Sequence, residues 1–464
     1  MSFNLKEFQG KKVHLIGIGG SMMSGIAGIL LENGIRVSGS DQGESKALAA
    51  VRRLGATVKG AHHKDNIYDQ DLVIYTTAIR PDNPELLEAT TRGIPTMTRS
   101  EFLGHLMKNF QWGVGIAGTH GKTTTTSMLT AAALSSGLDP TVLVGAHMPQ
   151  IDSNYRVGQS EVFLVESCEY KRSFLDFPPR LAIILNVEED HVDVYHSLDE
   201  VLEAFGRYVE QVPEDGCVLL NADHPGAMAL VDRAQAKVQT FGVEQGDYAA
   251  SRPEIDEWGR PSFSVTEHGV PLFHIKLPVP GVVNVTNALA ATAAARILGA
   301  EAADIKKGLE SYPGVDRRMQ KLGEIRGIRF MDDYAHHPSE VKASMETISH
   351  IPCGRLIVVF QPHTFTRLRR FLKDFVPLFD AADLTLLLPV FAAREQDDGT
   401  ISSNTLGDLI RERDQTHCIN CENYEKAAQV LLDQAQEGDV VLLMGAGEGY
   451  RIYDLLQANE TMNP

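Results

Sequence analysis

The chain has few of the features expected of an exported or membrane-bound protein. Its 464 residues include only five cysteines, an odd and small number that cannot form a disulfide framework and indicates a reducing compartment. Cys418 and Cys421 form a lone C-x-x-C, which favours a structural role over a zinc or redox site. No apolar run could serve as a signal peptide or a membrane helix. We therefore expect a cytoplasmic protein.

Positive charge is also scarce. The formal net charge of -18 argues against binding to nucleic acid or to an anionic membrane, because either surface needs a basic face. An anionic ligand would have to be held by local positive charge, as at Lys122, at Arg317 with Arg318, or in the cluster from Arg367 to Arg370. The sequence also lacks short repeats and low-complexity segments.

The length of the chain predicts several domains. A prior of about 150 residues per domain suggests about three. Strand-like runs alternate with helical stretches in three successive blocks, which predicts α/β folds with largely parallel sheets. Residues 246–279 alternate more like antiparallel hairpins. We place the domains at residues 1–108, 109–313 and 314–464.

The most informative motif is a glycine loop that follows the apolar run 112–117 and precedes a helix predicted at residues 127–134. In such a loop the backbone N–H groups point toward phosphate oxygens, Lys122 adds positive charge, and the Thr123 hydroxyl can reach Mg²⁺. Ile116 replaces the first glycine of the strict pattern, and a plain strand-to-helix turn is the alternative. The prediction is an ATP site made by Gly118, Thr119, His120, Gly121, Lys122, Thr123 and Thr124.

A second glycine turn opens the chain. A strand predicted at residues 12–18 leads through Gly17, Gly19 and Gly20 into a predicted helix, 23–33. Met22 replaces the last glycine of the dinucleotide fingerprint, so the pattern is weak evidence for NAD and better evidence for some nucleotide. Asp41, after the next strand, could accept hydrogen bonds from ribose hydroxyls or simply start a turn.

Two further ionisable residues follow buried-looking strands of the second block. Glu166 ends the run Phe163-Leu-Val-Glu, and His191 lies in Asn186-Val-Glu-Glu-Asp-His. If the strand ends meet, these side chains and the Thr123 hydroxyl are suitable ligands for magnesium or manganese. A lone histidine is more often an ordinary hydrogen-bonded group, so His191 depends on this pattern.

The third block begins with Asp332-Asp-Tyr-Ala-His-His-Pro338, whose dense ionisable groups at a strand end indicate a site. A capped helix start is the alternative, but it leaves the two histidines unexplained. Gln361-Pro-His363 and Arg367 follow another buried strand at the same sheet edge. We interpret Arg369 and Arg370 as solvated, and the turn from Gly445 to Gly449 as either a ligand site or a plain connection.

In this order, the motifs resemble those of the Mur ligases of peptidoglycan synthesis over nearly the whole chain. The resemblance rests on Gly17-Ile-Gly-Gly-Ser-Met-Met-Ser-Gly, Gly118-Thr-His-Gly-Lys-Thr-Thr-Thr, Asp332-Asp-Tyr-Ala-His-His-Pro and Phe360-Gln-Pro-His. It implies a Rossmann-like first domain that binds a UDP-sugar and a central P-loop ATPase-like domain with a mostly parallel sheet. It also implies a C-terminal Rossmann-like α/β domain that closes over both with an amino acid.

The resemblance also implies roles for individual residues. Val283, Met22 and Thr364 stand where the family often has other residues. The implied catalytic residues are Lys122, Glu166, His191, His363 and Arg367, of which His363 and Arg367 fall near the amino acid and the muramate. The implied metal ligands are Thr123, Glu166 and His191, and the further ATP contacts are Asn284, Asn287, Arg318 and Asp333. The implied UDP-sugar contacts are Gly17, Gly19, Gly20, Ser21, Ser24, Asp41, Thr76, Thr77 and Ala78.

The implied reaction is an ATP-dependent joining of L-alanine to UDP-N-acetylmuramate through an acyl phosphate, with Mg²⁺ or Mn²⁺. The partners would be these small molecules, without nucleic acid or membrane, and the chain would be a monomer or a homodimer. Three alternatives remain open at this point. They are a recycling ligase that attaches a whole peptide, a P-loop protein that binds ATP without a second substrate, and an NAD-linked oxidoreductase built on the first block.

Overall fold

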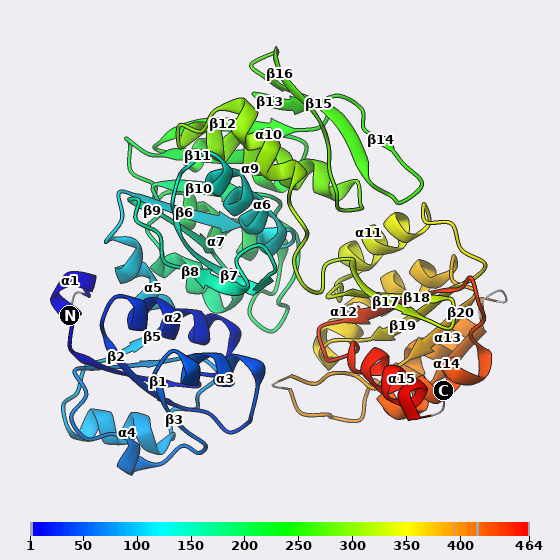
Figure 1. Ribbon diagram of the computed structural model, residues 1–464, viewed down its shortest axis with the longest axis horizontal. Helices are drawn as coiled ribbons and strands as arrows, with labels where there is room; N and C mark the ends of the chain where they lie inside the picture. Colours follow the sequence, from blue (N-terminus) through cyan, green and yellow to red (C-terminus); the bar gives the residue numbers. More distant parts are fainter. Residues whose placement is uncertain (1–2, 394, 414–416, 463–464) are drawn as a thin grey trace.

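The computed structural model describes residues 3–393, 395–413 and 417–462 and contains three successive α/β units, each built on its own sheet (Figure 1). The predicted fold class is confirmed. Residues 1–2 and 463–464, at the ends of the first and third predicted domains, lie outside the described part. We call the three parts the first, central and third units.

The first unit is a parallel sheet in the order β3-β2-β1-β4-β5. Its central strand β1 has neighbours that are reached by crossovers in opposite directions, and ligands of such sheets bind at that switch point. The strands are β1 (Lys12–Ile16), β2 (Arg36–Ser40), β3 (Thr57–Lys59), β4 (Leu72–Tyr75) and β5 (Thr96–Thr98), and the helices are α1 (Leu5–Phe8), α2 (Ser21–Glu32), α3 (Lys46–Arg53), the 3-10 helix η1 (Lys64–Asn66), α4 (Pro84–Thr91) and α5 (Arg99–Met107).

The central unit has the largest sheet, in the order β14-β15-β13-β12-β11-β10-β6-β9-β7-β8 with β16 beside β15. Its middle is parallel, and β13 to β16 form the antiparallel part predicted for residues 246–279. The strands are β6 (Trp112–Ala117), β7 (Thr141–Met148), β8 (Ser153–Arg156), β9 (Val162–Glu166), β10 (Leu181–Ile184), β11 (Cys217–Asn221), β12 (Lys237–Gly242), β13 (Tyr248–Ala250), β14 (Glu254–Ile255), β15 (Pro261–Glu267) and β16 (Val270–Lys276). The helices are α6 (Lys122–Ser135), η2 (Tyr170–Asp176), α7 (Leu198–Val209), α8 (Pro225–Met228), η3 (Val231–Arg233), α9 (Val283–Ile297) and α10 (Ala302–Glu310).

Helix α6 begins at Lys122, earlier than the start predicted at residue 127. The prediction was wrong because a run of threonines is a poor helix former. Here Thr125 and Thr126 are fully buried, and the Thr126 hydroxyl donates to the Lys122 carbonyl at 2.8 Å. Packing of the buried helix against the sheet therefore outweighs its low propensity.

The third unit has the sheet order β17-β18-β22-β19-β20-β21, in which only β17 runs antiparallel to its neighbour. The strands are β17 (Gln320–Ile325), β18 (Ile328–Asp333), β19 (Leu356–Gln361), β20 (Leu384–Leu387), β21 (His417–Asn420) and β22 (Val440–Gly445), and the helices are α11 (Pro338–Ile348), α12 (Phe365–Phe375), η4 (Val376–Phe379), α13 (Ser403–Arg411), α14 (Tyr424–Gln434) and α15 (Arg451–Met462).

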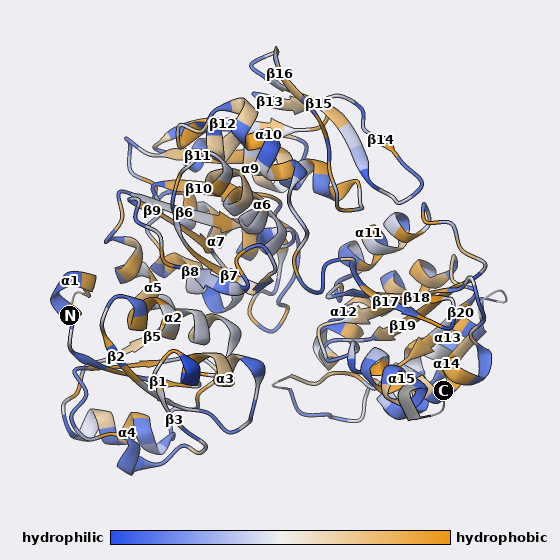
Figure 2. Cartoon of the chain, viewed as in Figure 1, coloured by the Kyte–Doolittle hydropathy of each residue, from blue (hydrophilic) through white to orange (hydrophobic). Residues whose placement is uncertain are grey.

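The strands of each unit carry the apolar residues and the outer helices turn polar faces to solvent (Figure 2). The first and central units also share a hydrophobic core, in which α2 lies against β7 and β8. Glycines permit this approach, because a Cβ on Gly25 would lie 2.3 Å from the Leu143 side chain and one on Gly28 would lie 2.1 Å from Tyr155. The glycine-rich start of α2 is therefore held against the central unit.

None of the helices seen in the described residues combines the length and the apolarity that a membrane crossing requires. Cys418 and Cys421 are buried, and burial raises the pKa of the Cys418 thiol to about 11. A protonated, buried thiol fits the structural role expected for this pair.

Candidate active site between the central and third units

The phosphate loop joins β6 to α6 and depends on glycine at two positions. Gly118 has φ 145° and Gly121 has φ 86°, in the left-handed region that side chains rarely adopt. Gly121 is the N-cap of α6 and offers no side chain to its first-turn amides. Those amides have no acceptor within the helix, so the loop presents N–H groups to an anion.

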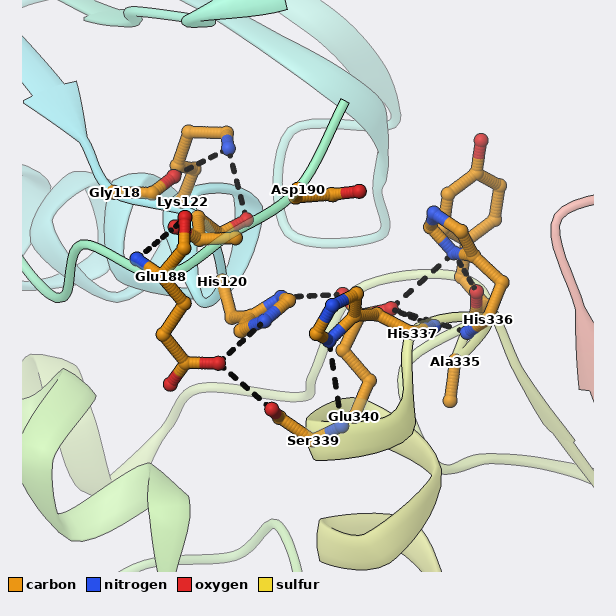
Figure 3. Close-up of polar contacts among 12 residues, drawn as sticks. Gly118, His120, Lys122, Glu188, Asp190, Ala335, His336, His337, Ser339 and Glu340 are labelled. Atoms are coloured by element: carbon orange, nitrogen blue, oxygen red, sulfur yellow. Dashed lines mark hydrogen bonds and ion pairs between the residues drawn. The ribbon is translucent and has the colours of Figure 1, made fainter. Parts of the chain in front are cut away.

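Lys122 is the first residue of α6, and its side chain folds back over the loop (Figure 3). Its ammonium donates to the Gly118 and Thr119 carbonyls and to the Glu169 carboxylate, at 2.9 and 3.2 Å from the two Glu169 oxygens. Burial disfavours the charge, but Glu169 outweighs it and raises the pKa of Lys122 above its ordinary value. The lysine is therefore charged and close to where phosphate oxygens would sit.

Glu166 meets the start of α6, as the sequence predicted. One of its oxygens accepts the Gly145 N–H at 2.8 Å. Burial raises the pKa of Glu166, against the opposing effects of Gly145, the Thr123 hydroxyl and Lys122. A half-buried carboxylate beside a hydroxyl is suited to a hard divalent cation.

His191 lies close to Glu169. Its Nε2 lies 3.5 Å from Glu169 Oε1, and burial is outweighed by Asp190 and Glu169, which raise the pKa of His191. Glu166 thus contacts Thr123 and His191 contacts Glu169, and the convergence of Thr123, Glu166 and His191 on one cation stays a prediction. Glu169 contacts both Lys122 and His191.

Within the described residues, the acid and histidine side chains that come close enough to hold a metal form one group of three: His120, Glu188 and His337. Both ring nitrogens of His337 are already engaged, because Nδ1 accepts from the Ser339 N–H at 3.3 Å and Nε2 contacts the Glu189 carbonyl at 3.2 Å. Metal ligation would break one of these contacts. We therefore interpret the group as a hydrogen-bonded ion network between the central and third units.

The Asp332 to Pro338 segment runs from β18 into α11, and its acids serve the local fold. Asp333 accepts from the Met319 and Ala335 amides and from the Ser344 hydroxyl, while burial raises its pKa to about 6. Arg318, predicted to reach ATP, lies over the Tyr334 ring. The capped helix start is therefore confirmed, with His337 as the N-cap, and the site interpretation of this segment stays a prediction.

The histidines of the third unit face each other, with ring centroids of His336 and His363 5.0 Å apart. His336 Nδ1 contacts the Tyr334 carbonyl at 2.8 Å, so its Nε2 is the acceptor atom of the ring. Burial lowers the pKa of His336 to about 4. His363 Nδ1 accepts from Arg367, and burial, His336 and Arg367 together lower its pKa to about 2.

Arg367 is buried and paired across the two units. Its guanidinium donates to one oxygen of Asp190 from Nη2 at 2.6 Å and from Nε at 3.1 Å. Burial opposes the charge of Asp190, but His191 and Arg367 lower its pKa below the ordinary range. Arg370, expected to be simply solvated, also crosses the units and pairs with Glu189 at 2.9 Å, whereas Arg369 pairs with Asp398 in its own unit.

The predicted adenine contacts lie at the start of α9. Asn287 is buried, and its Oδ1 accepts from the Thr125 hydroxyl at 3.2 Å. A Cβ on Gly121 would lie 2.7 Å from that oxygen. Asn284 accepts from the Asn287 amide at 2.9 Å, so both asparagines lie beside the phosphate loop.

The glycine turn at the end of β22, for which a ligand site and a plain connection were both open, is hydrogen-bonded to Arg317, which donates to the Gly445 carbonyl at 2.6 Å.

The predicted UDP-sugar residues gather at the carboxyl ends of β1, β2 and β4. A Cβ on Gly17 would lie 3.0 Å from Thr76, and Gly20 donates to the Gly17 carbonyl at 3.2 Å. Asp41 accepts the Gly19 N–H at 2.8 Å, which ties the second strand to the glycine turn. Thr77 and Ala78 follow in the turn after β4.

Two serines at the start of α2 are already engaged. Ser24 donates to the Ser21 carbonyl at 2.8 Å, within the helix. Ser21 donates to the Gly145 carbonyl at 2.6 Å, and the Gly145 amide donates to Glu166. One residue of β7 therefore connects the first unit to the carboxylate beside the phosphate loop.

Sequence reasoning missed four acids that organise this region: Glu169, Glu188, Asp190 and Glu340. Glu188 and Asp190 stand next to His191 in a run of acids, and Glu340 is the third residue of a capping box after His337. Those local signals were present. The ion-pair partners of these acids could not be predicted, because they come from distant segments of the chain.

Comparison with known proteins follows the same three parts. Residues 12–111 match the model of the Mur ligase family, catalytic domain, residues 116–295 that of the Mur ligase middle domain, and residues 317–447 that of the Mur ligase, glutamate ligase domain. A Clostridium perfringens protein named UDP-N-acetylmuramate--L-alanine ligase is 43% identical over 455 residues, covering 98% of this chain and 99% of that protein.

Solved structures agree. The UDP-N-acetylmuramate-alanine ligase of Thermotoga maritima aligns with a TM-score of 0.83 and 28% identity, over 98% of this chain and all of the other. A murein peptide ligase of Psychrobacter arcticus aligns with a TM-score of 0.73 over 97% of this chain and 98% of the other, and at 22% identity it shows the shared fold alone.

Proposed function

The chain belongs to the Mur ligase family, and we propose that it joins L-alanine to the lactyl carboxylate of UDP-N-acetylmuramate, driven by ATP, in peptidoglycan precursor synthesis. The observation that carries this function is the identity of 43% over almost the whole length to a relative that is named for the reaction. The charged Lys122 in its phosphate loop fits a reaction that begins at ATP.

The first step is phosphorylation of the lactyl carboxylate. A carboxylate oxygen attacks the γ-phosphorus, the bond from that phosphorus to the β-phosphate oxygen breaks, and ADP leaves. Two anions must approach each other, so positive charge has to offset their repulsion. Lys122 supplies it from the loop, and Arg318 is our candidate from the third unit, in keeping with the roles that the resemblance implies.

Mg²⁺ would be held by Thr123 and Glu166, with His191 nearby. The fit is supported by the Glu166 carboxylate, which lies beside the Thr123 hydroxyl and whose pKa is raised because burial disfavours its negative charge. When bound, the cation would supply further charge neutralisation at the phosphates. Glu169 keeps Lys122 and His191 in place through its two contacts.

In the second step the neutral amine of alanine attacks the acyl carbon, the bond to the phosphate oxygen breaks, and inorganic phosphate leaves. The ammonium form must first lose a proton. Of the two candidate acceptors, His336 is better suited than His363, because its Nε2 lone pair is available while Nδ1 contacts the Tyr334 carbonyl. His363 accepts from Arg367 instead and has a pKa of about 2.

The remaining roles follow the units. We assign the UDP-sugar to Gly17, Gly19, Gly20, Asp41 and the turn after β4, and adenine to the region of Asn284 and Asn287. We assign the incoming amino acid to the third unit near His336 and His363. Domain limits at residues 1–108, 109–313 and 314–464, a cytoplasmic location and a monomeric or dimeric state remain predictions.

Release of ADP and phosphate by the purified protein tests the function. We expect turnover that requires both UDP-N-acetylmuramate and L-alanine, with stoichiometric formation of the amide product. A tripeptide in place of L-alanine tests the recycling alternative, and ATP hydrolysis indifferent to the UDP-sugar would favour a P-loop protein of another kind. Preference for the tripeptide over L-alanine, or ATP hydrolysis that does not depend on the UDP-sugar, would refute the proposal. A nicotinamide absorbance change without ADP release would refute it as well.

The magnesium assignment makes a separate prediction. Replacement of Glu166 by Gln should raise the Mg²⁺ concentration for half-maximal activity by roughly 10- to 100-fold, because a neutral amide is a poorer ligand for a hard cation. The readout is a Mg²⁺ titration at saturating ATP. Glu161→Gln, an exposed carboxylate before the same strand β9, is the matched control and should titrate like the wild type.

A further inference from the structure

The ring of His120 points from the phosphate loop toward the third unit (Figure 3). Its backbone is fixed within the central unit, because the His120 N–H donates to Asn186 Oδ1 at 2.8 Å and the Asn186 amide donates to the His120 carbonyl at 3.1 Å. The loop backbone therefore serves the phosphates, and the side chain is left to make contacts elsewhere.

Those contacts join two carboxylates from different units. His120 Nε2 lies 3.4 Å from Glu188 of the central unit, and Nδ1 lies 3.2 Å from Glu340 of α11. The ring also lies against His337, with centroids 4.8 Å apart. Burial opposes the charged ring, but the two carboxylates raise the pKa of His120 to about 9, so both nitrogens carry protons at neutral pH.

Glu340 connects this contact to the start of α11. Its Oε2 accepts the amides of His336 at 3.1 Å and His337 at 3.2 Å, which completes the capping box of the helix, and its Oε1 faces His120. Glu340 thus links the ring of His120 to the backbone of His336, the proposed proton acceptor.

We propose that His120 is a positioning residue that aligns the start of α11, and with it His336, on the nucleotide-loaded phosphate loop. The proposal rests on the proposed function. Bound ATP phosphates would fix the conformation of the loop, and the His120 ring would then fix the position of Glu340. The third unit would thereby hold His336 where it can accept the proton of the attacking amine. The role differs from nucleotide binding, because it acts on the second substrate's side of the reaction.

Docking of the third unit does not depend on this contact alone. Arg367 pairs with Asp190, Arg370 pairs with Glu189, and the Ser339 hydroxyl donates to Glu188 at 2.7 Å. Loss of the His120 contact should therefore leave the chain folded and the units docked, while alignment suffers.

The test compares His120→Gln, Glu340→Gln and the double variant. Glutamine at position 340 keeps a capping-box acceptor but removes the charge that faces His120. We expect each single change to lower kcat by roughly 10- to 100-fold, with the KM for ATP within about threefold of wild type. Glu340→Gln also takes the charge from the contacts of Glu340 with His336 Nδ1 at 3.2 Å and Arg318 at 3.8 Å, so it should be the slower single variant. We also expect the double variant to be no slower than Glu340→Gln, because the His120–Glu340 interaction is already lost in that variant. His224→Gln is the control: it removes another histidine contact to Glu188 and a long hydrogen bond from the Val187 N–H, does not touch Glu340, and should keep the wild-type kcat.

Circular dichroism should match the wild type for all of these variants, and urea unfolding should show that each stays folded under the assay conditions. A wild-type kcat in His120→Gln, a loss confined to the KM for ATP, or independent, multiplying effects in the double variant would each overturn the inference. Failure of the proposed function is distinct, since it would be seen in the wild type as turnover that does not need both substrates.

Discussion

Replacement of Lys122 by alanine is expected to abolish turnover, with kcat lowered by about 10³-fold or more, while the chain stays folded. The ammonium is the charged side chain of the phosphate loop itself, folded over the loop carbonyls and held by Glu169 at 2.9 Å. It would face a γ-phosphate on which negative charge must be stabilised during transfer, and removal of such groups has effects of this size.

The measurement is ADP release under saturating substrates, with ATP binding followed by calorimetry. Lys306→Ala removes a half-exposed lysine of α10 and should retain full activity. Lys122→Ala leaves Glu169 buried without its main partner, which costs stability. The double variant Lys122→Ala with Glu169→Gln removes that orphaned charge and should be equally inactive but more stable. Full activity in Lys122→Ala would refute the phosphate-loop assignment.

Replacement of Arg367 by methionine should have the second large effect. The guanidinium and Asp190 are both buried, and together they join α12 to the loop that carries His191. Breaking a buried pair by removing one partner costs about 3–5 kcal/mol, because the other charge remains uncompensated. We expect the loss to fall on the docking of the third unit and to lower kcat by about 10²-fold or more.

A rescue experiment separates charge from packing. Arg367→Met combined with Asp190→Asn removes both charges, so the double variant should be more stable to urea than Arg367→Met alone. Arg369→Met, whose partner Asp398 is exposed, is the control and should change stability little. If Arg367→Met and Arg369→Met behaved alike in urea unfolding and in kcat, the interunit pair would have no special role.

Much of the fold could be read from the chain because the relevant signals are local. Apolar runs predicted β6 and β9 within a residue of their observed limits, and the alternation in residues 246–279 predicted antiparallel strands. The start of α6 could not be read. Its threonines argue against a helix, and only their burial between the sheet and α9 reverses that preference.

The candidate site divides in the same way. The phosphate loop was recognisable because its chemistry lies in consecutive residues, where Gly118 and Gly121 adopt positive φ and Lys122 follows at once. The sequence offered both His336 and His363 as proton acceptors without a choice between them. Our preference for His336 rests on the contact of His363 with Arg367, which only the structure shows. The proton affinity of a histidine depends on its burial and on neighbouring charges, and neither can be predicted from the order of residues along the chain.

By itself, then, the sequence determined the succession of three α/β units and the family to which the chain belongs, and it predicted the nucleotide chemistry of the loop. Only the tertiary structure decided how the charges are paired. Lys122 meets Glu169 across 47 residues of chain, and Arg367 meets Asp190 across 177. An ionisable side chain acquires its role from whatever charge the fold brings within a few ångströms of it, and that distance is set by the packing of the sheets and helices.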